Sequence, residues 1–319
     1  MDSVHLSQRE RSDRIERCDP GEGLLSRREL RPLTRFALDD ASHRQEQIDL
    51  SPLGRGEPPK RAMIRNSRTC LAVILACIAL PALAAQPKPD ATIKTGAIEG
   101  NVYLGARIKA DPALAADCLA EGRRWLSKNA ADAASLMKGD PQFFRRGGWS
   151  FERKYRVSSV VADRYVSIVR SDFMDTHGAH PNANVNTILW DARAGKRISI
   201  RPFFKETANN GPTMRAMLKD VVAALKIEKK KRDIGETASI DWFKDLEPTL
   251  LKIGAVTLAP STEAGKSSGL TFYYPPYAVG PYVEGEYVVF VPWETFKPYV
   301  SAEGARIFAG RRPEGDDEE

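Results

Sequence analysis

Cysteine and histidine are both scarce in this chain, which has only four of each among its 319 residues. Three of the cysteines, Cys18, Cys70 and Cys77, lie before residue 85. Since Cys118 alone follows, residues 85–319 cannot form an internal disulfide. No metal-ligand pattern lies near Cys118 in the sequence, so we expect it to be a small buried hydrophobic residue.

Two familiar motifs are missing as well, the Walker phosphate-binding loop and the His-Glu-x-x-His zinc motif. Of the 48 Lys and Arg residues, 14 precede residue 85, and of the 42 Asp and Glu residues, 12 do. Residues 85–319 therefore have 34 basic and 30 acidic residues, a net charge of +4. These charges are interspersed and form no basic stripe of the kind that binds nucleic acid. The sequence therefore predicts no nucleic-acid partner and no cofactor. It leaves enzymatic activity open and favours a protein that is not an enzyme.

An apolar run is present at Cys70–Leu80. It is too short for a stable membrane span, and its flanking residues follow the order of a secretory signal peptide: Arg65, Arg68, Ala82 and Ala84. We expect residues 63–84 to be a signal peptide. The following 235 residues (319 minus 84) would then be periplasmic or secreted, and not integral to the membrane. Cys77 lies in a weak lipoprotein-type cleavage sequence, but the Ala-x-Ala site favours soluble release over lipidation.

Residues 1–62 show no lasting helical or strand periodicity, and the sequence predicts a disordered leader there. The favoured interpretation is that translation begins at Met63 and that the leader is a start-site artefact. The alternative is a cytoplasmic tail that precedes a signal anchor.

Apolar periodicity indicates an α+β fold, with antiparallel sheets and packed helices in two halves. Helical patterns cover residues 113–138, after the capping pair Asp111-Pro112, and residues 213–230. Strand patterns lie at residues 149–157, 165–170, 184–191, 197–200, 250–258, 269–274 and 287–291. The halves are assigned to residues 85–200 and 201–310, with an acidic tail at 311–319. The cations at 229–232 are expected on a solvated face at the end of the second helix.

The stretch Asp172–Trp190, DFMDTHGAHPNANVNTILW, joins two predicted strands and holds His177 and His180. With Asp172 or Asp175 these histidines could share a metal ion, or act as general acid and base. The favoured interpretation is structural. His180 would hydrogen-bond backbone groups and fix the turn, and His177 would be exposed.

Gly178, Pro181 and Asn182 indicate that this loop is rigid. Gly178 is expected to provide a positive φ angle or a close backbone approach, and the Pro-Asn pair is typical of a turn. Rigid polar loops at strand ends are often recognition elements. We therefore expect a binding surface at Gly178, His180, Pro181 and Asn182.

Five tyrosines are interleaved with three prolines over residues 273–287. Tyrosine provides a large amphipathic contact area at a low entropic cost, so Tyr274, Tyr277 and Tyr282 are predicted contact residues. The equally weighted alternative is that alternate tyrosines belong to the core and that the prolines shape a crossover loop.

Three segments together resemble one family: residues 175–182 (DTHGAHPN), 189–197 (LWDARAGKR) and 272–285 (FYYPPYAVGPYVEG). They are similar to the paired domains of unknown function found outside the membrane in a lysozyme-sensing anti-sigma factor, and beside some polysaccharide deacetylase domains. The resemblance covers residues 97–300. It implies an α+β fold and an extracytoplasmic role, but not an enzyme, because the deacetylase centre lies in a separate domain. His180 occupies the family's motif histidine position, whereas His177 is an extra residue of this chain.

The function that we expect is an exported, non-enzymatic recognition module. It would bind an envelope protein or a peptidoglycan fragment through the His180 loop and the tyrosine-rich loop. The alternative is a metal-assisted hydrolase of envelope polymers that uses His177, His180 and Asp175. A passive envelope or assembly protein without a small ligand is the third possibility.

Overall fold

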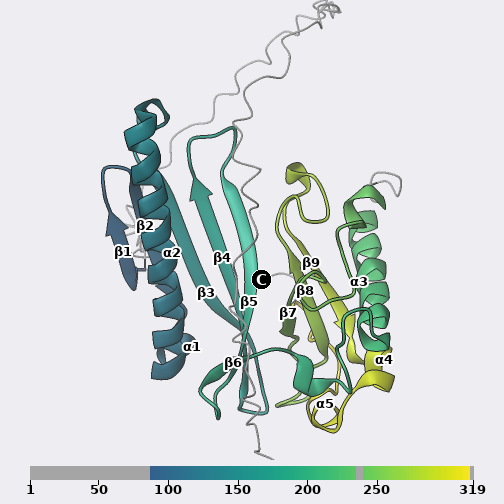
Figure 1. Ribbon diagram of the computed structural model, residues 1–319. Coiled ribbons are helices and arrows are strands. Elements are labelled where there is room, and N and C mark those ends of the chain that lie inside the picture. The colour runs from purple at the N-terminus through teal and green to yellow at the C-terminus, as the bar shows by residue number, and fades with distance from the viewer. Residues whose placement is uncertain (1–86, 235–239, 317–319) are drawn as a thin grey trace, which may run out of the picture. The chain divides into compact units, whose positions relative to one another are not determined.

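The computed structural model describes residues 87–234 and 240–316, which form the α+β fold that the sequence predicts (Figure 1). The predicted leader (residues 1–62), the predicted signal peptide (63–84) and the end of the acidic tail (317–319) lie outside the described residues. None of the helices in the described part of the chain is both long and apolar enough to cross a bilayer.

The described residues contain two sheets. The first has six strands in chain order: β1 (Ala91–Lys94), β2 (Ile98–Leu104), β3 (Trp149–Val161), β4 (Tyr165–Asp175), β5 (Asn182–Asp191) and β6 (Lys196–Ile198). The second is antiparallel and has three: β7 (Ala255–Leu258), β8 (Gly269–Tyr274) and β9 (Tyr287–Pro292). The helices are α1 (Ala106–Lys109), α2 (Pro112–Gly139), α3 (Pro212–Lys231), α4 (Trp293–Phe296) and α5 (Ala302–Ile307).

The six-stranded sheet is mixed, because β2 pairs with β3 in parallel while its other pairs are antiparallel. Parallel neighbours need a long crossover connection, and α1 and α2 provide it. The predicted start of this helix is confirmed: the Asp111 carboxylate accepts from the backbone N–H groups of Ala113 (3.0 Å) and Leu114 (3.1 Å), with Pro112 as the first helical residue.

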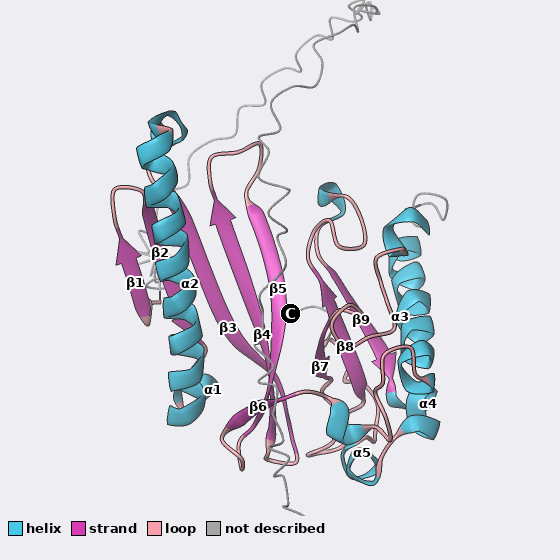
Figure 2. Cartoon of the chain, in the orientation of Figure 1, coloured by secondary structure: helices cyan, strands magenta, loops and turns pink. Residues whose placement is uncertain are grey.

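Helix α2 lies along one face of the six-stranded sheet (Figure 2). Leu114, Cys118 and Leu126 are buried against the sheet, and burial raises the pKa of the Cys118 thiol to about 12. The expected burial of Cys118 is therefore confirmed. Gly122 allows close contact, since a Cβ there would lie 2.9 Å from Cγ1 of Val102.

Helix α3 covers one face of the three-stranded sheet and buries Met214, Met217, Val221 and Leu225, as its periodicity predicts. The predicted strand at 250–258 begins later, at Ala255, because the chain turns through residues 249–254 before it.

Hydroxyl side chains of the six-stranded sheet form hydrogen bonds with backbone groups of the edge strand β7. Ser159 Oγ donates to the Leu258 carbonyl (2.6 Å), Ser167 Oγ accepts from the Leu258 N–H (3.1 Å), and Thr187 Oγ1 accepts from the Val256 N–H (3.0 Å). These bonds fix β7 on the face of the first sheet that lies opposite α2, so the two sheets share one core.

Candidate functional site

The loop between β4 and β5 meets the tyrosine-rich loop between β8 and β9. The ring of His180 stacks on Tyr282 with the centroids 3.7 Å apart and an interplanar angle of 19°, and Tyr277 lies 6.0 Å from His180 and 5.7 Å from Tyr282. We call His180, Tyr277 and Tyr282 the ring cluster. Residues that are about 100 positions apart in sequence thus form one feature.

Hydrogen bonds fix the orientation of the His180 ring. Its Nδ1 lies 2.9 Å from the Pro181 carbonyl, which also accepts from the Tyr282 hydroxyl at 2.9 Å. Because a carbonyl oxygen can only accept, Nδ1 carries the proton. In the neutral ring Nε2 is then the acceptor, and it lies 3.1 Å from the Tyr277 hydroxyl, which donates to it. Both loops are therefore held together by polar contacts as well as by stacking.

Each loop contains one residue other than glycine with a positive φ angle, His177 at φ +58° and Tyr277 at φ +71°. The Asp175 carboxylate stabilises the first by accepting from the His177 N–H at 2.8 Å. The expectation for Gly178 is wrong. It does not have a positive φ, and a Cβ there would meet only the His180 carbonyl oxygen, at 3.9 Å. His177 takes the positive φ angle in this loop instead. The expectation that His177 is exposed is also wrong, because its side chain is half-buried.

The other predicted contact residues occupy different positions. Pro181 contributes its carbonyl to the ring cluster, and Asn182 is exposed at the start of β5. Tyr277 is 54% exposed, but Tyr274 is 2% exposed and donates its hydroxyl to the Ile253 carbonyl at 2.5 Å. Tyr274 therefore belongs to the core and lies outside the ring cluster.

The candidate metal ligands do not converge. In the described residues, no group of three or more His, Cys, Asp or Glu side chains is arranged to hold a metal ion. His177 Nδ1 lies 3.8 Å from Asp175, while Asp172 turns to the opposite face of β4 and binds Arg153. The sequence did not predict this because the expected strand ended at residue 170, whereas β4 continues to Asp175. Successive residues of a strand point to opposite faces, so Asp172 and Asp175 point away from each other.

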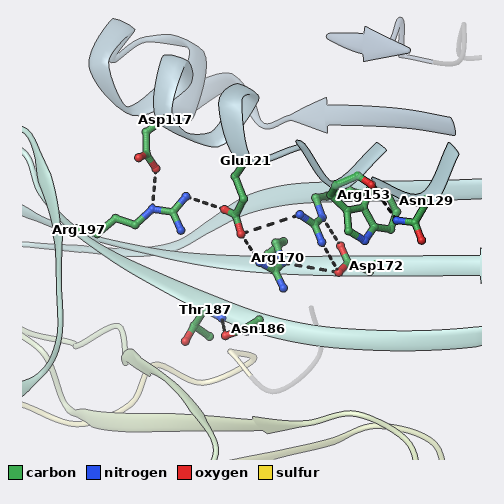
Figure 3. Close-up of polar contacts among 10 residues, drawn as sticks. Asp117, Glu121, Asn129, Arg153, Arg170, Asp172, Asn186, Thr187 and Arg197 are labelled. Carbon is green, nitrogen blue, oxygen red and sulfur yellow. Dashed lines mark hydrogen bonds and ion pairs between the residues drawn. The ribbon is translucent and has the colours of Figure 1, made fainter. Parts of the chain in front are cut away.

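Asp172 belongs to a buried ionic network between α2 and the six-stranded sheet (Figure 3). Arg153 donates to both carboxylate oxygens of Asp172, at 2.6 and 2.7 Å, and both side chains are only 4% exposed. Glu121 of α2 accepts from Arg170 and from Arg197 (2.6 Å). Arg197 also donates to Asp117 at 2.7 Å. The network thus contains three guanidinium groups and three carboxylates, whose charges balance.

Electrostatics hold Glu121 in its charged form. Burial alone would raise the pKa of this carboxyl group, but the guanidinium groups of Arg170, Arg197 and Arg153 outweigh it, so the pKa lies below its ordinary value. The Arg153 guanidinium also lies over the Trp125 ring, 4.3 Å from its centroid. Sequence reasoning missed this network, although arginines on the helix-facing side of a strand could have indicated buried carboxylate partners.

A second buried ion pair lies at the end of α3. Lys229 donates to Glu284 at 2.7 Å, the Tyr287 hydroxyl donates to the same carboxylate at 2.5 Å, and the Lys229 side chain is only 2% exposed. The expectation of a solvated face is therefore wrong for Lys229, while Lys231 is exposed. This pair ties the helix to the chain segment that carries Tyr282.

Residues 265–269 (GKSSG) match the Gly-x-Ser-x-Gly spacing of a hydrolase nucleophile. Such a serine must be exposed on a sharp turn from a strand into a helix. Ser267 is instead fully buried, precedes β8, and donates its hydroxyl to the Gly269 carbonyl at 2.8 Å. Ser267 therefore has a structural role and lacks the exposed turn that a nucleophile needs.

Comparison with known proteins identifies a family domain in the second part of the chain. Residues 204–294 match the model of a family described as a protein of unknown function (DUF3298). The chain thus contains a DUF3298 family domain, which includes α3, all three strands of the second sheet and the tyrosine-rich loop. The predicted resemblance to a domain of unknown function is confirmed to this extent, while its anti-sigma factor and deacetylase setting stays a prediction.

Two solved structures of DUF3298 family proteins are similar to the chain. One, from Pseudomonas aeruginosa PAO1, has 19% sequence identity and a TM-score of 0.46, with 67% of this chain and 88% of that chain covered. The other, from Bacteroides fragilis NCTC 9343, has 13% identity and a TM-score of 0.39, with 60% and 70% covered. No curated protein matches the chain.

Proposed function

We propose that this chain is an exported, non-enzymatic recognition module that binds an envelope protein through the ring cluster. The single observation that carries the proposal is the conformation of Tyr277. This residue is 54% exposed and has a φ of +71°. A left-handed backbone costs a residue other than glycine about 1–2 kcal/mol, and such strain is concentrated at functional sites.

The surroundings of Tyr277 support this role. Its hydroxyl is held by His180 Nε2, and His180 is in turn fixed by the stacked Tyr282 ring and by the Pro181 carbonyl. A large aromatic side chain is thus ordered before a partner arrives, which lowers the entropic cost of binding. Exposed tyrosines of this kind are frequent among the residues that dominate the affinity of protein interfaces.

Export is supported by the sequence of residues 63–84, which lies outside the described residues. A periplasmic or secreted location makes an envelope protein the natural partner, and a peptidoglycan fragment is the alternative. The geometry gives the hydrolase alternative no support, because both ring nitrogens of His180 are already hydrogen-bonded, one to the Pro181 carbonyl and one to the Tyr277 hydroxyl, and the described residues contain no group of three metal-ligating side chains.

Quantitative affinity capture from a cell-envelope extract tests the proposal. Immobilised wild-type protein should retain a discrete protein that Tyr277→Ala loses by at least tenfold. Tyr103→Ala, which alters a partly buried tyrosine of β2 outside the ring cluster, is the matched control and should retain it. Equal capture by all three proteins would refute the proposal, as would retention that depends on intact peptidoglycan in the extract.

A further inference from the structure

The facing surfaces of the two sheets enclose a cleft of about 800 Å³, which is separate from the ring cluster. One wall is the face of β3 and β4 opposite α2, the other is the face of the second sheet opposite α3, and the last turns of α3 border it. Its volume is typical of a site for a small or oligomeric ligand.

The walls of the cleft are polar and rich in hydroxyl groups. Ser158, Ser171, Thr257, Thr271 and Tyr273 line it. A hydroxyl group both donates and accepts hydrogen bonds. These walls therefore match a ligand whose own groups do both, as the hydroxyls of a sugar do.

Four cations and three carboxylates line the cleft, for a net charge of +1, and most of them pair with each other. Arg232 donates to Glu228 at 2.9 Å, and Arg312 donates to Asp316 at 2.6 Å. Arg156 differs, because it is exposed on β3 and makes no hydrogen bond or ion pair with any residue that the structure describes.

Glu286 faces Arg156 from the other wall without forming an ion pair in the described part of the chain. Although the side chain reaches solvent, enclosure by the cleft raises the pKa of this carboxyl group, and the Arg156 charge opposes the rise. The cleft thus presents a fork-shaped cationic donor on one wall and an acceptor on the other. Arginine forks bind carboxylates with two parallel hydrogen bonds.

From these contacts we infer that the cleft binds an acidic oligosaccharide, with a ligand carboxylate on Arg156 and ligand hydroxyls on Glu286 and the hydroxyl-lined walls. An extended peptide is disfavoured, because peptides add to the edge of a sheet, whereas the cleft lies between the faces of the two sheets. This inference goes beyond the proposed function and does not depend on it, since the two sites share no side chain.

Isothermal titration calorimetry of the protein with tetragalacturonate tests the inference, with maltotetraose as the neutral sugar and tetraglutamate as the acidic peptide. Tetragalacturonate should bind, and the other two should bind at least tenfold more weakly. Arg156→Gln should weaken tetragalacturonate binding about ten- to hundredfold, which is the worth of a charged hydrogen-bonded contact. Arg123→Gln, at an exposed arginine of α2, is the matched control and should bind like wild type.

A second variant, Ser171→Leu, fills the exposed wall of β4 and should weaken binding at least tenfold while the melting temperature is unchanged. Tyr277→Ala should leave tetragalacturonate binding unchanged, so that failure of the ring cluster and failure of the cleft can be distinguished. Absence of tetragalacturonate binding, equal binding of tetraglutamate, or an Arg156→Gln variant that binds like wild type would overturn the inference.

Discussion

Replacing Asp172 with asparagine should destabilise the fold strongly. The substitution keeps the shape of the side chain but removes its negative charge. The Arg153 side chain is 4% exposed and donates to the two Asp172 carboxylate oxygens at 2.6 and 2.7 Å. The next carboxylate, Glu121, is 3.9 Å from Arg153 and already binds two other arginines. Removing one partner of a buried ion pair lowers the free energy of unfolding by about 3–5 kcal/mol. For a domain of this size that corresponds to a fall in Tm of about 6–20 °C.

Urea unfolding followed by circular dichroism gives the free energy of unfolding, and calorimetry gives Tm. Asp132→Asn is the matched control, because Asp132 pairs with Lys128 at 2.8 Å with side chains 62% and 77% exposed. It should cost at most about 1 kcal/mol. The double variant Arg153→Met/Asp172→Leu should recover most of the loss, since apolar residues can replace a buried pair. An Asp172→Asn protein as stable as the control would refute the structural role of Asp172, and bound zinc that this substitution removes would restore the metal-site hypothesis.

Three further predictions concern other positions. Lys229→Ala should cost about 3–5 kcal/mol, because it strands the Glu284 carboxylate, whereas Lys231→Ala should cost at most about 1 kcal/mol; similar urea midpoints would contradict this. The folded pKa of Glu121 lies below its ordinary value of 4.5, so its contribution is present above that pH and is lost as the pH falls below it. Glu121→Gln should therefore flatten the acid limb of a stability–pH curve, and an unchanged limb would show that Glu121 is not the titrating group. Gly178→Ala should change stability by less than about 0.5 kcal/mol, and a larger loss would show that Gly178 needs its conformational freedom.

Local sequence patterns predicted much of the fold because they depend on neighbouring residues. The capping pair at Asp111 and the apolar stripe of α3 were sufficient to locate the two long helices. The parallel pairing of β2 with β3 could not be read in this way, because strand order depends on where the crossover helix returns.

The candidate site was predicted in part. The sequence singled out both loops, but only the fold shows that His180, Tyr277 and Tyr282 come together while Tyr274 enters the core. The buried ion pairs of Asp172 and Lys229 were not predicted, because each has a partner that is distant in the sequence. Asp172 pairs with Arg153, and Lys229 pairs with Glu284. The cleft was missed for the same reason, because its walls come from strands of both sheets.

Site-specific photo-crosslinking in intact cells tests the central claim most directly. A photoreactive benzoylphenylalanine would replace Tyr277 in one variant and the control residue Tyr103 in another. A recognition surface at the ring cluster predicts a discrete protein adduct from position 277 that is absent from position 103. No adduct from position 277, or the same adducts from both positions, would contradict it.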